Sequence, residues 1–123
     1  MEFEDITEKI IKCAMDVHTA LGPGLLENAY KECLFHKLNK TGLYVEKEKP
    51  LPVVFEGISL DCGYRIDLLV ENSVVIELKS IKNIDDIHMA QILTYLRLGK
   101  FKVGLIINFN VLSLKDGIKR VVN

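Results

Sequence analysis

The fold is decided by residues 64–79, which read YRIDLLVENSVVIELK. Two runs of apolar residues flank a short polar segment, and this arrangement is typical of two strands joined by a turn. Strands are therefore predicted over residues 64–70 and 74–79, with Glu71, Asn72 and Ser73 between them.

The pairing of these two strands follows from their side chains. A three-residue loop sets Leu68 opposite Ile76 and Ile66 opposite Leu78, so one face of the hairpin is wholly aliphatic. A two-residue loop would instead set charged side chains against apolar ones on both faces. The three-residue loop is preferred, because a slip by one residue moves every side chain to the other face.

The preferred pairing places Asp67 opposite Glu77, with their Cβ atoms about 5 Å apart. Two carboxylates about 4.5 Å apart repel by roughly 4 kcal/mol at an effective dielectric near 20. A divalent cation would remove this repulsion, and Mg²⁺ favours one or two carboxylates together with waters and phosphate oxygens. Lys79 lies on the same face, where its ammonium group could hold a water or a phosphate oxygen.

A solvated polar face carrying a Glu–Lys pair is the alternative interpretation, since many antiparallel sheets have one such face. Leu69 and Val75 share the face with the two carboxylates, which predicts that part of it is buried. The sequence also inserts Glu77 and Lys79 into an otherwise aliphatic run. These features favour a metal site.

The remaining elements follow from hydrophobic periodicity and from Gly and Pro positions. Helices are predicted over residues 6–21, 25–40 and 84–98, and strands over residues 44–48, 51–55, 103–108 and 117–122. Asp5 with Glu8, and Asn83 or a neighbour, are expected to cap the first and third helices. Pro50 and Pro52 favour a sheet edge, and the apolar strand 103–108 favours its interior. The order predicts a single α/β domain over residues 1–123, with helices on the faces of a mixed central sheet.

Composition limits the classes of protein that fit. The chain has 123 residues, 49% of them hydrophobic and 27% charged, enough for one domain with its own core. Its net charge of −1 disfavours a dedicated nucleic-acid coat protein. Residues 97–123 nevertheless carry six Lys or Arg against one Asp, which suits either a phosphate backbone or a solvated edge. The acidic start and short apolar runs predict a cytoplasmic protein with no membrane partner.

Cysteine and histidine provide a competing metal hypothesis. Cys13, Cys33 and Cys62 are odd in number and lack a C-x-x-C spacing, which disfavours disulfides and a zinc ribbon. Cys33 and His36 are three apart on a predicted helix, which permits a metal ligand pair. Buried thiols are the favoured interpretation, and His18 is expected to be a structural histidine.

The hairpin motif resembles that of a known superfamily. Asp67 followed by Glu77-Leu78-Lys79 is similar to the D…E-x-K motif of the PD-(D/E)XK nuclease superfamily, with Ile66 where proline often precedes the aspartate. This motif by itself is common.

Other segments make the resemblance specific. Gly24, Glu27 and Tyr30 match the signature of the GxxExxY protein family, and Gln91 with Tyr95 resembles the Q-x-x-x-Y element of RecB-like members. Further matches extend the resemblance over nearly the whole chain, at residues 17–18, 22–24, 104–109 and 117–120.

The resemblance implies a restriction-endonuclease-like α/β core and a Mg²⁺-dependent nuclease, with Mn²⁺ as a substitute. Its substrate would be nucleic acid, DNA in preference to RNA. Asp67, Glu77 and the backbone carbonyl of Leu78 would hold the metal, which would polarise the phosphate and activate a water. Lys79 would orient that water or stabilise charge on the phosphorus.

Glu27 would bind a second metal or order a water, although a first-turn glutamate is also favoured by the helix dipole. Gln91 and Tyr95 would be supporting residues on the third helix. That helix is apolar nearly all round, so it is expected to be well buried, with Gln91 inside and in need of hydrogen-bond partners.

Two other interpretations remain open. The first is a catalytically silent nucleic-acid-binding or assembly module that keeps the fold, since the chain has no separate DNA-reading domain and no strong positive field. Such a module could be a homodimer or one subunit of a larger complex. The second and weaker is a Cys/His metal protein, which chelators would unfold.

Overall fold

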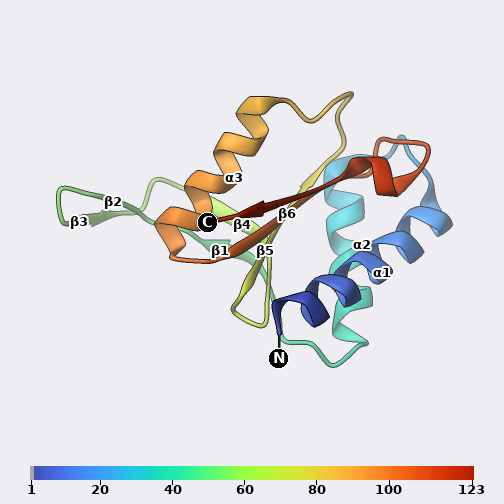
Figure 1. The fold of residues 1–123 in the computed structure, drawn as a ribbon, viewed down its shortest axis with the longest axis horizontal. Helices are drawn as coiled ribbons and strands as arrows, with labels where there is room; N and C mark the ends of the chain where they lie inside the picture. Colours follow the sequence, from blue (N-terminus) through green and yellow to red (C-terminus); the bar gives the residue numbers. More distant parts are fainter. Residues whose placement is uncertain (1) are drawn as a thin grey trace.

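The computed structural model describes residues 2–123, which form a mixed five-stranded sheet with helices on both faces (Figure 1). The strand order is β1-β4-β5-β6-β7, and β5 with β6 is the parallel pair. The elements are α1 (Phe3–Leu21), α2 (Glu27–Asn39), β1 (Val45–Pro50), β2 (Val53–Phe55), β3 (Ile58–Leu60), β4 (Arg65–Val70), β5 (Val74–Lys79), α3 (Asp86–Gly99), β6 (Val103–Asn108), a 3₁₀ turn (Leu114–Gly117) and β7 (Ile118–Val122). The predicted architecture is confirmed.

Two hydrophobic cores lie on opposite faces of the sheet. Helices α1 and α2 cover one face, and α3 covers the other (Figure 1). Among residues 2–123, the α1–α2 core contains 20 buried residues and the α3 core contains 8. Strand β6 contributes to both and is buried along its whole length, so the predicted interior strand is confirmed.

The pairing of β4 with β5 follows the three-residue loop. Leu68 pairs with Ile76, and Val70 with Val74. The ladder ends there, however, so the expected pairing of Ile66 with Leu78 is wrong. Ile66 instead packs in the α3 core, whereas Leu78 packs in the α1–α2 core. The two strands thus separate just beyond Leu68 and Ile76.

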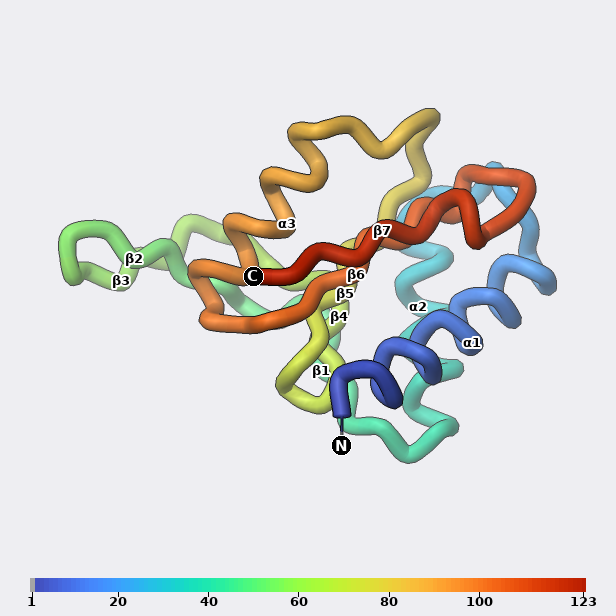
Figure 2. The backbone as a smooth tube through the Cα atoms, in the orientation of Figure 1, coloured from blue at the N-terminus to red at the C-terminus, as the bar shows by residue number. Residues whose placement is uncertain are grey.

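The expectation of an edge position for the proline-containing segment is confirmed for β1, which pairs only with β4 and ends at Pro50. The strand predicted over residues 51–55 is shorter than expected and has a partner that the prediction missed. Strands β2 and β3 form a separate hairpin, which projects from the body as an arm (Figure 2). Glu56 and Gly57 form its turn with φ of 51° and 78°, as a tight two-residue hairpin requires.

The helix starts differ from the predicted ones. Helix α1 begins at Phe3, so Asp5 lies inside it and does not cap it. Helix α2 begins at Glu27, which leaves Gly24 in the preceding loop with φ of 101°. The prediction allowed Asn83 or a neighbour to cap α3, and the cap is Asp85, whose N–H donates to Nδ1 of His88 at 2.9 Å.

Helix α3 is less buried than its composition suggested. Ile92, Tyr95 and Leu96 are its buried residues, while Gln91 is exposed and Ile87 is 71% exposed. The prediction of a buried Gln91 is therefore wrong. The helix packs one side against the sheet and nothing in the described chain covers the other side.

The predicted burial is correct for His18 and for one of the three cysteines. His18 is buried, and its Nε2 lies 2.8 Å from the carbonyl oxygen of Val111, which confirms a structural role. Cys13 is buried as expected, but Cys33 and Cys62 are exposed free thiols. Within residues 2–123, no helix is both long and apolar enough to cross a membrane.

Gly104 allows α3 to approach β6 closely. A Cβ atom at this position would lie 2.8 Å from Cδ1 of Ile92 and 3.3 Å from Cδ2 of Leu96. We predict that Gly104→Val lowers the free energy of unfolding by about 1–3 kcal/mol, because the added atoms overpack the α3 core. Urea denaturation measures this change. Ala20→Val on the exposed surface of α1 is the control, and an equal loss in both variants would contradict the explanation.

Candidate active site

The candidate site lies where β4 and β5 separate. In place of a further ladder bond, the Leu78 N–H donates to Oδ2 of Asp67 at 2.9 Å. The Asp67 N–H points back toward Oε1 of Glu77 at 3.5 Å. The two carboxyl groups are thus linked through backbone hydrogen bonds across neighbouring strands. Asp67 and Glu77 are not partners in the ladder, which ends at Leu68 and Ile76, so the expected direct pairing of Asp67 with Glu77 is wrong.

Glu77 occupies an unfavourable place for a charge. Burial, the negative charge of Asp67 and hydrogen bonding between the two carboxyl groups raise the pKa of Glu77 from 4.5 to about 9. The positive charge of Lys79 opposes this rise but does not cancel it. At neutral pH the pair therefore keeps one proton in the absence of a cation.

Glu27 approaches the same pair from α2. Burial and then the charge of Asp67 raise the pKa of Glu27, whereas the charges of Lys79 and Lys31 lower it. Its carboxyl is therefore close enough to both Asp67 and Lys79 to interact with them. The expectation that Glu27 faces the carboxylate site agrees with this arrangement.

Tyr30 holds the loop that precedes Glu27. The Tyr30 hydroxyl donates to the Gly22 carbonyl at 2.6 Å and accepts from the Leu25 N–H at 3.0 Å. Its ring is fully buried and stacks on Phe109, with centroids 4.5 Å apart. These contacts fix the loop before α2 and hence the position of Glu27 in the first turn.

A second set of contacts holds the segment that follows Lys79. The Phe109 N–H donates to the Lys79 carbonyl at 3.0 Å, and the Ser80 hydroxyl donates to the Leu25 carbonyl at 2.7 Å. The buried side chain of Asn108 accepts from the Ile81 N–H at 3.1 Å and donates to the Ile81 carbonyl at 2.9 Å. Sequence reasoning missed Asn108, although a polar residue ending an apolar strand was a visible signal.

Lys31 is another residue that the prediction missed. It lies one turn after Glu27, and its Nζ is 2.8 Å from Oε1 of Glu48. Burial alone would lower the pKa of Lys31, but the bond to Glu48 and the charge of Asp67 raise it. The spacing of four from Glu27 was the available signal, since it places both residues on one side of α2.

Helix α3 brings Tyr95 to the site from the opposite face of the sheet. Burial and then the charge of Glu77 raise the pKa of Tyr95, with a smaller contribution from Asp67. Nε2 of the exposed Gln91 lies 3.4 Å from the Tyr95 hydroxyl. Tyr95 therefore lies near enough to the carboxyl groups to feel their charge, and the exposed Gln91 contacts Tyr95.

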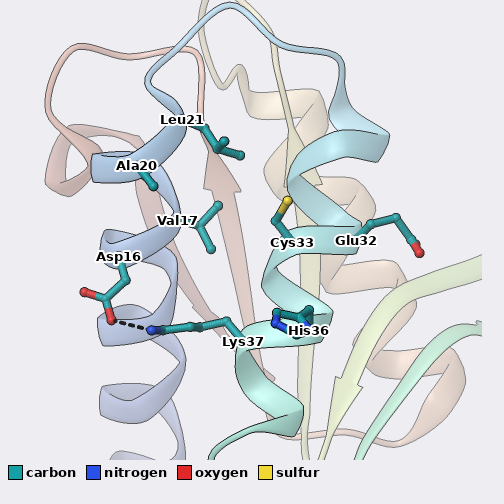
Figure 3. Close-up of a pocket in the computed structure, with 8 residues that line it drawn as sticks. All are labelled: Asp16, Val17, Ala20, Leu21, Glu32, Cys33, His36 and Lys37. Atoms are coloured by element: carbon teal, nitrogen blue, oxygen red, sulfur yellow. Dashed lines mark ion pairs between the residues drawn. The ribbon is translucent and has the colours of Figure 1, made fainter.

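The Cys/His hypothesis gains no support. Cys33 and His36 line an apolar groove of about 370 Å³ between α1 and α2 (Figure 3). Their charged neighbours Asp16 and Lys37 pair with each other at 3.5 Å. Nowhere in residues 2–123 do three or more His, Cys, Asp or Glu side chains gather so that they could hold a metal. The same holds for Glu27, Asp67 and Glu77, which do not form such a group of three.

Comparison with known proteins gives one match. A family model described as the PD-(D/E)XK nuclease superfamily matches residues 4–121. No curated protein and no solved structure matches the chain.

The Tyr30 hydroxyl gives a test of how Glu27 is positioned. We predict that Tyr30→Phe lowers the free energy of unfolding by about 1–3 kcal/mol, because two buried hydrogen bonds are lost while the stacked ring remains. Urea denaturation measures the loss. Tyr44→Phe changes an exposed tyrosine and is the matched control. Equal stability of Tyr30→Phe and the parent would contradict the role given to the hydroxyl.

Glu77 predicts an unusual dependence of stability on pH. Its pKa is raised in the folded state, so its contribution to the free energy of unfolding is fully present below about pH 4.5 and is lost as the pH rises towards about 9. In metal-free buffer the parent should therefore lose stability between pH 5.5 and pH 8.5, by the standard linkage relation.

Urea denaturation at several pH values, in the parent and in Glu77→Gln, measures this contribution. The variant cannot lose a proton at this position, so its stability should fall less over the same range. Parallel curves for the two proteins would show that Glu77 ionises in the folded state as it does in water.

Proposed function

Because the chain belongs to the PD-(D/E)XK nuclease superfamily, we propose that it is a Mg²⁺-dependent nuclease that hydrolyses phosphodiester bonds of nucleic acid, DNA in preference to RNA. Mn²⁺ would substitute for Mg²⁺. The observation that carries the proposal is the Asp67–Glu77 pair, two carboxyl groups on neighbouring strands that are tied to each other's strand by the N–H groups of Leu78 and Asp67.

The residues present fit a divalent cation. Asp67 and Glu77 are hard oxygen donors, and an open site with few protein ligands suits Mg²⁺, which keeps several waters and takes phosphate oxygens. A cation would also replace the proton that the pair otherwise retains. Asp67 and Glu77 would hold the ion with the backbone carbonyl of Leu78, and Glu27 would hold a second ion or order a water.

The remaining chemistry is assigned to this chain's own side chains. When bound, the ion supplies a Lewis acid for the phosphate. Lys79 would donate hydrogen bonds to the attacking water or to the phosphate oxygens and would stabilise negative charge as it develops there. Tyr95 and Gln91 would support the carboxylates from α3, and the contacts of Lys79 and Ser80 with Phe109 and Leu25 would keep the ammonium group in place.

The free thiols support the proposed compartment. Cys13, Cys33 and Cys62 are all free, and two of them are exposed. Exposed thiols persist in a reducing environment. A cytoplasmic location is therefore part of the proposal.

Cleavage assays test the proposed roles. We predict that Asp67→Ala abolishes Mg²⁺-dependent cleavage of labelled DNA, and that Lys79→Ala lowers its rate at least about 100-fold, the usual effect of removing one electrostatic stabiliser. Glu8→Gln and Lys12→Ala, on the exposed surface of α1, remove charges of the same signs and should leave the rate unchanged. Circular dichroism verifies folding. Cleavage at the parent rate by both site variants would refute the roles.

Metal binding can be measured without turnover. We predict that Mg²⁺ or Mn²⁺ raises the melting temperature of the parent. Binding adds about 2.7 kcal/mol to the free energy of unfolding when the free ion is at a hundredfold excess over its Kd. Glu77→Gln should erase the rise, whereas Glu8→Gln should keep it. A rise that depends on Glu77, without cleavage of DNA or RNA, would indicate a silent binding module. No rise in the parent would contradict the metal site.

A further inference from the structure

A second groove opens beside the carboxylate site and the proposed function does not use it. The groove has a volume of about 400 Å³ and lies between α3 and the root of the β2–β3 arm. Its polar groups are Tyr64, Gln91, Thr94 and Tyr95. The other lining side chains are aliphatic, and none of the lining side chains carries a charge.

One residue of the groove reaches the candidate active site. Tyr95 lines the groove, and the same side chain is close enough to Glu77 and Asp67 for their charges to raise its pKa. Tyr64 immediately precedes β4, three residues before Asp67. A ligand in the groove would therefore lie next to the two carboxylates.

Aromatic rings shape this groove. The rings of Tyr64 and Tyr95 meet edge to face, with centroids 6.0 Å apart and an interplanar angle of 64°. Tyr64 remains 45% exposed and Ile87 71% exposed, so an apolar surface is left open to solvent. A flat aromatic ligand would cover this surface, and the exposed amide of Gln91 would offer both a donor and an acceptor to its edge.

The distribution of charge argues for a base here and for the phosphate elsewhere. Lys79 and Lys31, the cations that interact with the carboxylates, do not line the groove. A sugar–phosphate backbone would be poorly held by an uncharged apolar surface. A nucleobase suits it, because base–aromatic stacking needs an open ring and no charge.

We propose that this groove is a subsite for one unpaired nucleobase, stacked on Tyr64, next to the phosphate to be cleaved. This inference rests on the proposed nuclease function and adds its substrate class, which is single-stranded nucleic acid or an unpaired end. A base within a duplex stays covered by its neighbours and its partner, so it has to leave the stack before it can enter.

Binding of oligonucleotides tests the subsite. Fluorescence anisotropy of the full chain, in Ca²⁺ buffer with the probe shown by gel to stay intact, compares labelled 20-nucleotide oligothymidylate with the same strand in a blunt duplex. The parent should bind the single strand more tightly. Tyr64→Ala should weaken that binding about fivefold or more, the loss expected for one stacked base. Tyr64→Phe keeps a ring and should stay within about twofold of the parent.

Tyr44→Ala is the matched control, since Tyr44 is 59% exposed and does not line the groove. The subsite is refuted if the parent binds the duplex as tightly as the single strand or binds neither. It is also refuted if Tyr64→Ala binds like the parent. A parent dimer that Tyr64→Ala and Ile87→Ser both convert to monomers, seen by light scattering, would assign the groove to a second copy of the chain and refute the subsite too.

The result separates the subsite from the nuclease function. Asp67-dependent cleavage with unaltered binding by Tyr64→Ala rejects the subsite alone. Binding that depends on Tyr64, without cleavage, rejects turnover alone. If Tyr64→Ala does not fold, ultraviolet cross-linking of the parent to oligothymidylate and mass spectrometry replace it. A cross-link at Tyr64 or Tyr95 supports the subsite, and cross-links confined to other residues refute it.

Discussion

One hydrogen bond organises the site, the 2.9 Å bond from the Leu78 N–H to the carboxylate of Asp67. It stands where β4 and β5 would otherwise continue their ladder, so the backbone donor remains satisfied while the strands separate. The separation lets Ile66 enter one core and Leu78 the other. Glu27 of α2 interacts with the charge of Asp67, and Tyr95 of α3 interacts with that of Glu77, so both helices reach this pair of carboxyl groups. The carboxyl groups are consequently held together in spite of their repulsion.

Much of the fold could be predicted because it depends on local patterns. The period of two in residues 64–79 fixed the pairing of Leu68 with Ile76, and the prolines marked the edge strand. The prediction failed where contacts between distant segments of the chain determine the structure. Nothing local in the sequence indicates that the two strands separate beyond Leu68. Nor does it indicate that α3 packs on one side only and leaves Gln91 exposed. The β2–β3 arm was missed because its apolar residues are exposed and its turn is Glu56-Gly57, a less familiar pair than Asn-Gly.

The candidate site residues also divide into those that a local pattern reveals and those that only tertiary contacts reveal. Asp67, Glu77 and Lys79 lie on one short segment, so the predicted hairpin was enough to single them out as candidate site residues. Asn108 and Lys31 depend on contacts over long sequence separations, and the separation of 27 positions between Ile81 and Asn108 hides their pairing from any local pattern. Tyr30 lies between these cases, because the segment that contains it resembles a family signature, but only the structure shows its hydroxyl joining Gly22 to Leu25.

The inequality of the two cores has a consequence for motion. The α1–α2 side contains 20 buried residues and the α3 side 8, counted over the described chain. Local opening requires less free energy where fewer apolar contacts must be broken, and regions of low local stability are commonly those that admit ligands. We therefore expect helix α3 to open before α1 does, and its amide protons to exchange with solvent ahead of those in α1. Such a local opening would move Tyr95 away from Glu77 and leave Glu27 and Tyr30 in place, so the surroundings of the two carboxyl groups would change from one side of the sheet only.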